Sequence, residues 1–435
     1  MLELCMKPIV KRGALALLLL LLIEIAPLSL HAGDKKKKPE PAPPQKREIP
    51  DFSRIVFPLE PAVPRVRYLD FFATSLPDYG EKRDEQKKQR WMDRLAGVDP
   101  NAASKKQPKV RYALLAPYGV AVDSKQLLYV ADTKVGAVFI FNTENDDVQL
   151  IRNGAEAHFK SVLGLAIDDA DHVFVSDNGL HVVEEFGADH KYIGSFGSDV
   201  LRGPCGIALD PENRYLYVVD TDLDQVIVFD ADTRNVIRKI GTTGKSHTLT
   251  DPGEFSKPTN AAVDKDGNLY VSDTLNDRVQ VFDADGNFIR TWGKNGDGPG
   301  NFARPKGIAI DADGHVWVAD AMLNRLQIFT PEGQLLLAFG NFGNMPGQFQ
   351  TLTGLTIDKS NRVFAAEQFL GRVQMFRYYT DAEARAELEK RKAGGGANKQ
   401  SANAQKTGSS SATPPAAPTA PGSASNPQTN PPNQR

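Results

Sequence analysis

Two closely similar stretches decide the fold, Lys257-Pro-Thr-Asn-Ala-Ala-Val-Asp264 and Arg304-Pro-Lys-Gly-Ile-Ala-Ile-Asp311. Nine residues after each closing Asp comes a second acid, Asp273 in Tyr-Val-Ser-Asp and Asp320 in Trp-Val-Ala-Asp. A unit of this kind, about 45 residues long, recurs six times between residues 111 and 379. Because one such unit cannot bury its own apolar face, the repeat predicts an architecture in which neighbouring units share a core.

Two acidic positions mark the register of the repeat. The first acid recurs as Asp123, Asp168, Asp210, Asp264, Asp311 and Asp358. The second acid follows nine residues later, or ten in the third unit, as Asp132, Asp177, Asp220, Asp273, Asp320 and Glu367. The near-constant spacing indicates that all six units have the same fold.

Each unit is predicted to contain four short strands. The first, as in Gly307-Ile-Ala-Ile310, is apolar throughout, which is typical of a strand buried on both faces. The second and third are rich in Val, Tyr, Ile and Phe, which favour packed, pleated surfaces. Sequences such as Asp264-Lys-Asp-Gly267 separate the strands, and Asp and Gly are typical of tight antiparallel turns. Four-stranded antiparallel sheets at this period indicate an all-β fold, a six-bladed β-propeller.

The sixth unit lacks a fourth strand. After Val373-Gln-Met-Phe376 the chain continues into residues 380–392, which have a helical composition. A missing strand would leave an open sheet edge, which natural proteins avoid. Residues 65–73 are strand-like and lie upstream of the repeats, so we expect this N-terminal strand to complete the last blade.

The repeated motif resembles that of the NHL-repeat family of six-bladed β-propellers. It reads Pro-x-Gly-Ile-Ala-x-Asp, then Tyr-Val-x-Asp, then Asn-x-Arg-Val-Gln-Val-Phe, and the resemblance covers roughly residues 65–379. The first two units depart from it, with Ala137 and Val182 at the position of Arg278, Arg325 and Arg372 in the later units. Propellers of this family serve as binding platforms, sensor domains and, more rarely, enzymes, so the resemblance implies a fold and leaves the function open.

The N-terminal residues predict export. Residues 1–32 combine Lys7, Lys11 and Arg12 with an apolar run at 14–23 and a small residue at Ala32, as cleaved secretory signals do. The run is short for a membrane span, and an uncleaved anchor is the alternative. We therefore expect an extracytoplasmic protein, periplasmic or secreted. Beyond the signal only Cys205 remains, which excludes an intramolecular disulfide.

The composition divides the rest of the chain into five parts. We predict a Pro- and Lys-rich linker at 33–64, a propeller at 65–379 with its blades from about residue 110, a helical insertion at 80–97, a short helix at 380–392 and a disordered tail at 393–435. The protein is expected to be a monomer.

The net charge of −2 is unevenly distributed along the chain. Residues 110–379 hold 24 Lys and Arg against 36 Asp and Glu, whereas residues 33–109 hold 18 against 12. A ring with a net charge of −12 lacks the basic balance that phosphate binding needs, so nucleic acid is not expected as a partner. The basic N-terminal segment is interpreted as a solvated tether rather than a membrane- or partner-binding patch. Membrane contact is expected only through an uncleaved signal.

The repeated acids invite a metal-site interpretation. However, they recur at equivalent strand ends in every unit and do not converge, so turn capping is the favoured interpretation. The three repeated Arg residues are likewise interpreted as inter-strand ion-pair partners. The inner strands contain no His, and the histidines beyond the signal show no metal-ligand spacing: His158, His172, His181, His190, His247 and His315. No catalytic residue, metal ligand or cofactor is therefore predicted.

One position at the start of each inner strand varies while the residues around it repeat. It is the residue just before the recurring Gly, whose place is taken by Asn260 in the fourth unit. Such variation gives a symmetric scaffold a binding site, and tolerated surface positions are the alternative explanation. We expect these residues to lie at the rim of one face and to bind a partner: Tyr118, Leu163, Cys205, Thr259, Lys306 and Thr353.

The sequence thus favours an exported, non-catalytic binding or scaffold protein. It would present a propeller face to a protein or small ligand of unknown identity. The alternative is a metal-dependent hydrolase or lyase, lactonase-like or amidating-lyase-like, that uses the central channel.

Overall fold

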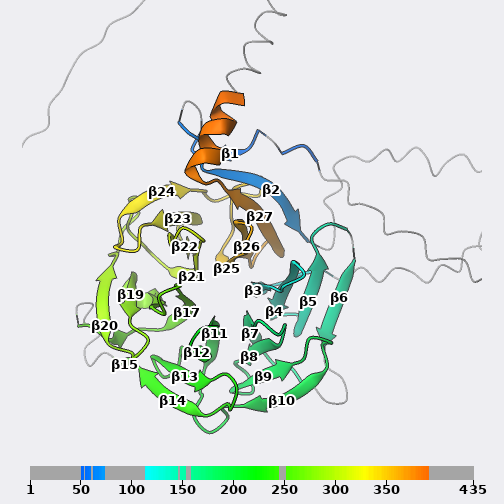
Figure 1. Ribbon diagram of the computed structural model, residues 1–435, viewed down its shortest axis with the longest axis vertical. Helices are drawn as coiled ribbons and strands as arrows, with labels where there is room; N and C mark the ends of the chain where they lie inside the picture. The colour runs from blue at the N-terminus through cyan, green and yellow to red at the C-terminus, as the bar shows by residue number, and fades with distance from the viewer. Residues whose placement is uncertain are drawn as a thin grey trace, which may run out of the picture. The chain divides into compact units, whose positions relative to one another are not determined.

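The computed structural model describes residues 50–52, 54–59, 62–73, 113–145, 147–152, 158–243 and 251–390. The predicted signal, helical insertion (80–97) and tail (393–435) lie outside these residues, as does most of the linker. Six antiparallel sheets form a ring (Figure 1), and the inner strands contact one another in sequence until β25 meets β3. The predicted six-bladed, almost all-β propeller is confirmed.

The strands fall into four concentric sets. The inner strands are β3 (Pro117–Val122), β7 (Val162–Ile167), β11 (Pro204–Asp210), β17 (Pro258–Val263), β21 (Pro305–Ile310) and β25 (Leu352–Ile357). The second strands are β4 (Leu127–Asp132), β8 (Val173–Asp177), β12 (Tyr215–Asp220), β18 (Leu269–Asp273), β22 (Val316–Asp320) and β26 (Arg362–Glu367). The third strands are β5 (Ala137–Asn142), β9 (Val182–Phe186), β13 (Gln225–Asp230), β19 (Arg278–Phe282), β23 (Arg325–Phe329) and β27 (Arg372–Tyr378). The outer strands are β6 (Val148–Arg152), β10 (Tyr192–Phe196), β14 (Val236–Ile240), β20 (Phe288–Trp292), β24 (Leu335–Phe339) and β2 (Val66–Phe72).

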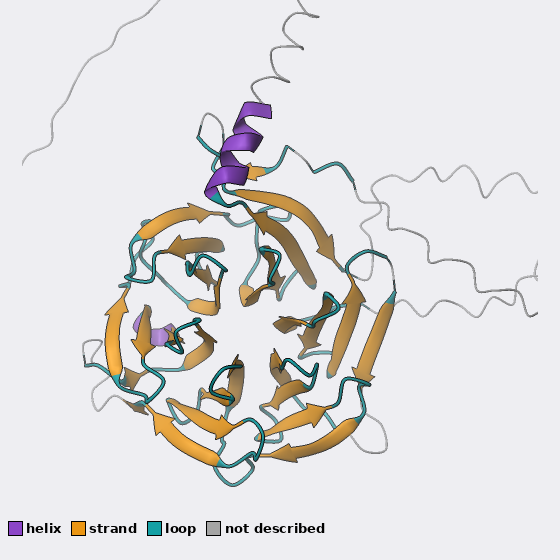
Figure 2. Cartoon of the chain, viewed as in Figure 1, coloured by secondary structure: helices purple, strands orange, loops and turns teal. Residues whose placement is uncertain are grey.

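The outer strand of the sixth blade comes from the N-terminal side of the chain. β2 pairs antiparallel with β27, from Val66 opposite Tyr378 to Phe72 opposite Val373. A two-residue strand that the sequence did not predict, β1 (Val56–Phe57), pairs with the outer edge of β2. Residues 381–390 form a helix at the outside of the ring beside these strands (Figure 2). No helix among the described residues has the length and apolar composition needed to cross a membrane.

The blades have two distinct faces. The turns between first and second strands, and between third and fourth strands, form the face that we call the turn face. The loops between second and third strands, together with the links that lead into each inner strand, form the other face, which we call the mouth face. Three mouth-face links end in a buried Phe after Pro-Gly-x: Phe255, Phe302 and Phe349.

The repeated acids hold these turns and links, as the turn-capping interpretation predicted. On the turn face, Asp123 accepts hydrogen bonds from the amides of Lys125 (3.0 Å) and Leu127 (2.8 Å). On the mouth face, Asp132 accepts from the amides of Leu115 (2.6 Å) and Ala116 (3.0 Å), just before the inner strand. Equivalent contacts recur in the other blades. These carboxylates therefore serve the backbone rather than a ligand.

An Arg and a Gln from the third strand anchor the long links. In the sixth blade, the Arg372 guanidinium donates to Glu367 (2.6 Å) and to the carbonyl oxygen of Asn344 (2.8 Å). Gln374 donates to the carbonyl oxygen of Gln348 (2.7 Å) and accepts from Gly347 (2.9 Å).

The other repeated Arg residues follow this pattern only in part. Arg278 pairs with Asp273 at 2.9 Å, so the predicted ion pairs are confirmed in the fourth and sixth blades. Arg325 instead donates to the carbonyl oxygen of Asp297 (2.6 Å).

The second blade lacks this Arg–Gln pair, because Val182 and Glu184 occupy the two positions. Glu184 is 3% exposed, and its Oε2 atom has no hydrogen-bond partner among the described residues. Burial, together with the neighbouring Asp177, raises the pKa of Glu184 to about 7. An ionised Glu184 cannot donate a hydrogen bond, whereas Gln374 at the same position both donates and accepts.

Glu184→Gln is expected to stabilise the ring, and more so at higher pH. Folding raises the pKa of Glu184, so the wild-type protein loses stability as pH rises from about 4.5 to about 7. The variant has no such loss, and the gain at pH 8 is on the order of 1–2 kcal/mol after allowance for solvent screening. Urea unfolding at pH 5 and pH 8 measures the difference. Equal gains at both pH values would contradict the assignment.

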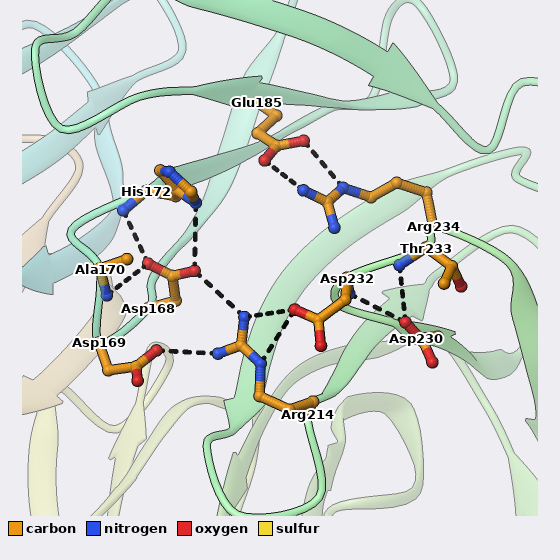
Figure 3. Close-up of polar contacts among 10 residues, drawn as sticks. All are labelled: Asp168, Asp169, Ala170, His172, Glu185, Arg214, Asp230, Asp232, Thr233 and Arg234. Carbon is orange, nitrogen blue, oxygen red and sulfur yellow. Dashed lines mark hydrogen bonds and ion pairs between the residues drawn. The ribbon is translucent and has the colours of Figure 1, made fainter.

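Ion pairs on the turn face connect the second and third blades (Figure 3). The Arg214 guanidinium contacts Asp168 (3.4 Å), Asp169 (2.9 Å) and Asp232 (2.8 Å). Arg234 forms a two-pronged contact with Glu185 of β9. Asp168, Asp169, Asp232 and Glu185 are therefore paired with cations of the same protein.

Candidate functional site

All six inner strands have an irregularity at their mouth-face end. The pairing of β3 with β4 shifts register between Pro117 and Val120, and the other five inner strands shift at the equivalent place. A bulge of this kind re-aims the side chain at its centre. The centre is the variable residue that the sequence singled out, so the bulges are the structural reason for its special position.

The backbones of neighbouring inner strands touch at the residue after the variable one. A Cβ atom on Gly119 would overlap the carbonyl oxygen of Leu163, and one on Gly354 would overlap that of Tyr118. Glycine is therefore required for this close approach. Asn260 takes the glycine position in the fourth blade, and its buried Nδ2 atom has no hydrogen-bond partner among the described residues.

Three of the six predicted residues meet across the channel. Tyr118, Cys205 and Lys306 come from the first, third and fifth blades. The Tyr118 hydroxyl lies 3.2 Å from the Cys205 Sγ atom, and the Lys306 Nζ atom lies 5.6 Å from the centroid of the Tyr118 ring. The distance from the Lys306 Nζ atom to the Tyr118 ring centroid lies within the range of a cation–π contact. We call these three residues the channel cluster.

Burial controls the protonation of the channel cluster. It raises the pKa of Tyr118 well above its usual value, and Cys205 adds to the effect. Burial also raises the pKa of the Cys205 thiol. In contrast, burial lowers the pKa of the Lys306 ammonium. The phenol and the thiol are therefore neutral at pH 7, whereas burial disfavours the charged form of Lys306, the one basic group of the cluster.

Lys306 has no anionic partner in the described part of the chain. Its electrostatic neighbours are Cys205 and the like-charged Arg304, and no described carboxylate pairs with its Nζ atom. A half-buried ammonium without a partner is costly, because desolvation penalises its charge. The channel cluster therefore has the electrostatic character of an anion-binding position.

The other three predicted residues lie in the even-numbered blades, and two of them form hydrogen bonds within the ring. Thr353 donates to the carbonyl oxygen of Pro117 (3.0 Å), which ties the sixth blade to the first. The Thr259 hydroxyl lies 2.8 Å from that of Thr274. Leu163 is half-buried.

The expectation that all six residues are exposed at a rim is wrong. Tyr118, Cys205, Thr259 and Thr353 are buried, because the bulge turns the side chain toward the channel rather than onto the outer surface. Truncation of Tyr118 to Ala would thus open a cavity. Whether the six residues bind a partner stays a prediction.

One group of described side chains has the spacing of a metal site, and it lies on the turn face. Asp311, Asp313 and His315 offer ligand atoms within 4.8 Å of one another. Asp313 and His315 also line a cavity of about 400 Å³ with Tyr378, Thr380 and Asp381. This cavity was not predicted from the sequence, because Tyr378 and Asp381 lie more than 60 positions away along the chain.

The repeat explains most of this group without a metal. The His315 Nδ1 atom lies 3.1 Å from Asp311, and the equivalent His172 of the second blade lies 3.3 Å from Asp168 (Figure 3). Asp311 also accepts from the indole of Trp317 (2.9 Å) and from the backbone amide of His315 (2.9 Å). The Asp–His pair is therefore a turn device used in two blades.

Comparisons with known proteins concern parts of the chain. A family model described as a 6-bladed beta-propeller matches residues 255–326. The probable peptidyl-alpha-hydroxyglycine alpha-amidating lyase of Caenorhabditis elegans is 34% identical over 102 residues, 23% of this chain and 28% of that protein. Peptidyl-glycine alpha-amidating monooxygenase B of Xenopus laevis is 27% identical over 181 residues, 34% of this chain and 20% of that protein. Protein brain tumor of Drosophila melanogaster is 26% identical over 129 residues, 29% of this chain and 12% of that protein.

Each of these matches spans less than a third of the relative's length. Among solved structures, a protein of unknown function from Bacteroides thetaiotaomicron is similar with a TM-score of 0.50 and 18% identity, over 61% of this chain and 70% of that one. At that identity the likeness concerns the fold alone. With its six repeats in register and its closed ring, the chain is a six-bladed β-propeller.

Proposed function

We propose that this propeller binds a ligand through an acidic group held at the mouth of its central channel. The observation that carries the proposal is Lys306, a half-buried lysine for whose ammonium form the described residues supply no anion. A carboxylate placed against its Nζ atom would offset the desolvation of the ammonium. The buried Tyr118 ring lies against the same Nζ atom and helps to fix its position.

The relatives support a second candidate, a lyase or hydrolase that uses the same channel. Two of them are named for amidating chemistry on peptides, and the name of the nematode protein specifies a lyase. The channel cluster contains three titratable groups, as an acid–base site needs.

A metal-dependent form of this candidate fits the channel poorly. None of the six bulge residues is His, Asp or Glu, and the Cys205 thiol is held neutral by burial, whereas metal ligands must be deprotonated. An assay for lyase and ester hydrolysis, before and after treatment with chelator, separates the two candidates. Substrate turnover by the wild type that disappears in the Lys306→Met variant would favour the lyase or hydrolase candidate.

Lys306→Met is expected to abolish acid binding and to leave the ring folded. A charged hydrogen bond is worth about 1.5–3 kcal/mol, so the affinity for an acidic probe such as N-acetylglutamate should fall at least tenfold. The melting temperature should stay the same or rise, since Met fills the space without a buried charge. NMR titration and calorimetry provide the two measurements.

Variants on the turn face are the control for this experiment. Lys265→Ala and Lys359→Ala remove cations from turns between first and second strands and should leave probe binding within twofold of the wild type. If those two changes abolish binding while Lys306→Met does not, the wrong face has been chosen.

We further propose that the protein works outside the cytoplasm, on the strength of the signal-like residues 1–32. Protein recovered from the native host is expected to begin near Gly33 and to fractionate outside the cytoplasm. Mass spectrometry of the N-terminal peptide checks this. An intact Met1 on cytoplasmic protein would contradict it.

A further inference from the structure

One register position of the third strands carries an extra carboxylate in the second blade. In the last three blades the position holds a glutamine, and in the first and third blades it is apolar. In the second blade it is Glu184, so that two buried acids, Asp177 and Glu184, lie beside Val182, where later blades have an arginine. The residues at the position of Glu184 in the other five blades are Phe139, Ile227, Gln280, Gln327 and Gln374.

The glutamines show what this position requires. In the sixth blade the Gln374 Nε2 atom donates to the second acid, Glu367 (2.6 Å), and to the carbonyl oxygen of Gln348 (2.7 Å) in the link. The fourth blade repeats both hydrogen bonds, at 3.0 and 2.9 Å. A side chain at this position thus meets two oxygen acceptors, and a donor or a cation is needed between them.

The same two acceptors are present in the second blade. Asp177 is the second acid, and its Oδ2 atom accepts from the amide of the residue after Phe159 (2.6 Å). His158 stands just before the buried Phe159, as Gln348 stands before its own buried Phe, so the carbonyl oxygen of His158 is the second acceptor. Glu184 therefore brings a third oxygen to a place where the later blades supply an amide donor.

The described residues provide no cation for these acids. Glu184 is 3% exposed and its Oε2 atom has no hydrogen-bond partner, while Asp177 is fully buried. Asp177 is the charged neighbour that acts on Glu184, and within the described part of the chain neither acid forms an ion pair. The exposed Lys160 does not supply the charge, since its side chain lies along Gly179. Two buried carboxylates without a cation are costly.

We propose that the second blade binds a calcium ion between the carboxylates of Asp177 and Glu184 and the carbonyl oxygen of His158. Two carboxylates match the charge of a divalent cation, and hard divalent cations prefer oxygen ligands. Calcium accepts irregular sets of about 6–8 oxygen ligands, including water, whereas magnesium demands near-ideal octahedral geometry.

Such an ion would do the work of the missing arginine and glutamine. In the sixth blade Arg372 and Gln374 together neutralise the second acid and hold the carbonyl oxygen of Gln348. Calcium bound to Asp177 and Glu184 would neutralise both acids and hold the link that leads into β7. The site is separate from the channel cluster and does not depend on the proposed function.

Thermal unfolding of the full-length protein at pH 8, after removal of metal ions with a chelator, tests the proposal. Calcium chloride at about 100 times its dissociation constant should raise the melting temperature of the wild type by about 5 °C. Glu184→Gln removes one ligand carboxylate, so its melting temperature should change by less than about 1 °C. The variant should therefore lose its advantage over the wild type when calcium is added.

A rebuilt blade provides a second variant. Val182→Arg combined with Glu184→Gln restores the arginine and glutamine that the sixth blade has as Arg372 and Gln374. This protein should melt above the wild type in chelator and should not respond to calcium. Asp313→Ala is the matched control, because it alters the acidic group on the turn face, and it should keep the full calcium response.

The outcomes are distinct. A calcium response that is lost in Glu184→Gln and kept in Asp313→Ala supports the site. A response that survives Glu184→Gln, or that is lost only in Asp313→Ala, overturns it. An equal response to sodium chloride at the same ionic strength overturns it in favour of general screening, and a larger response to magnesium overturns the choice of calcium. A wild type that does not respond to calcium also overturns it, with a protonated Glu184 as the donor instead.

Discussion

Deletion of residues 65–72 is expected to leave a protein that aggregates or melts far below the wild type. These residues include the whole of β2, which pairs along its length with β27. Val66, Tyr68, Phe71 and Phe72 are at most 3% exposed. Burial of one such side chain is worth about 1.5–3 kcal/mol, so roughly 6–12 kcal/mol is at stake. That loss is comparable to the whole stability of a typical domain.

The position of β2 makes the loss cooperative. Tyr68 belongs to the core shared by the fifth and sixth blades, whereas Phe72 belongs to the core shared by the sixth and first blades. The deletion therefore weakens both interfaces of the last blade and exposes the edge of β27 to other chains. Thermal unfolding and size-exclusion chromatography measure the two effects.

Truncation after residue 392 is the control for the strand deletion, because the removed sequence has no apolar face to bury. It should melt like the full chain. A strand-deleted protein with that same melting temperature would rule out a closing role for β2.

Local chemistry made the fold predictable from the sequence. Asp264 and Gly267 predicted a tight turn, and in the structure Asp264 accepts hydrogen bonds from the amides of Asp266 (2.9 Å) and Asn268 (2.8 Å). Each such turn depends on residues within five positions of each other, and six copies in register leave few alternatives. The absence of a fourth strand from the sixth unit could be predicted because the other five units define where that strand should be.

Contacts outside the repeat were not predictable. β1 and the parallel pair β15 (Thr242–Thr243) and β16 (Glu254–Phe255) are two residues long and have no periodic signal. Their pairing depends on which segments the closed ring brings together. Phe255 lies in the sequence pattern Pro-Gly-x-Phe, but the pattern does not predict where in the propeller the Phe255 side chain is buried.

The candidate site was predictable in position and not in arrangement. Variation on a repeated frame identified Tyr118, Cys205 and Lys306 as unusual. It could not show that they converge, because residues 118, 205 and 306 meet only when alternate blades face each other across the channel. Their burial was missed as well, since it follows from a bulge. The glycine after the variable residue was the available signal, because Gly inside a strand often marks a bulge.

Arg372→Met is expected to destabilise the protein by about 3–5 kcal/mol, the usual cost of breaking a buried ion pair. Glu367 is fully buried, and Arg372 is its only described cationic partner. Burial raises the pKa of Glu367, while Arg372 lowers it, so loss of the guanidinium leaves desolvation unopposed. The carbonyl oxygens of Asn344 and Gln348 lose the hydrogen bonds from Arg372 at the same time, although Gln374 still donates to Gln348. The melting temperature should fall by about 10 °C.

The pH dependence identifies the cause of this loss. Without Arg372, the folded-state pKa of Glu367 should rise further above its unfolded value, so the stability deficit should grow as pH rises and shrink toward pH 4. A second change, Glu367→Gln, should recover part of the stability at pH 8, because it removes the uncompensated charge. Arg325→Met is the matched control, since Arg325 donates to the backbone carbonyl oxygen of Asp297 and forms no ion pair with a carboxylate among the described residues. If Arg325→Met and Arg372→Met lower the melting temperature equally and with the same pH dependence, the Arg372–Glu367 pair has no special role in the ring.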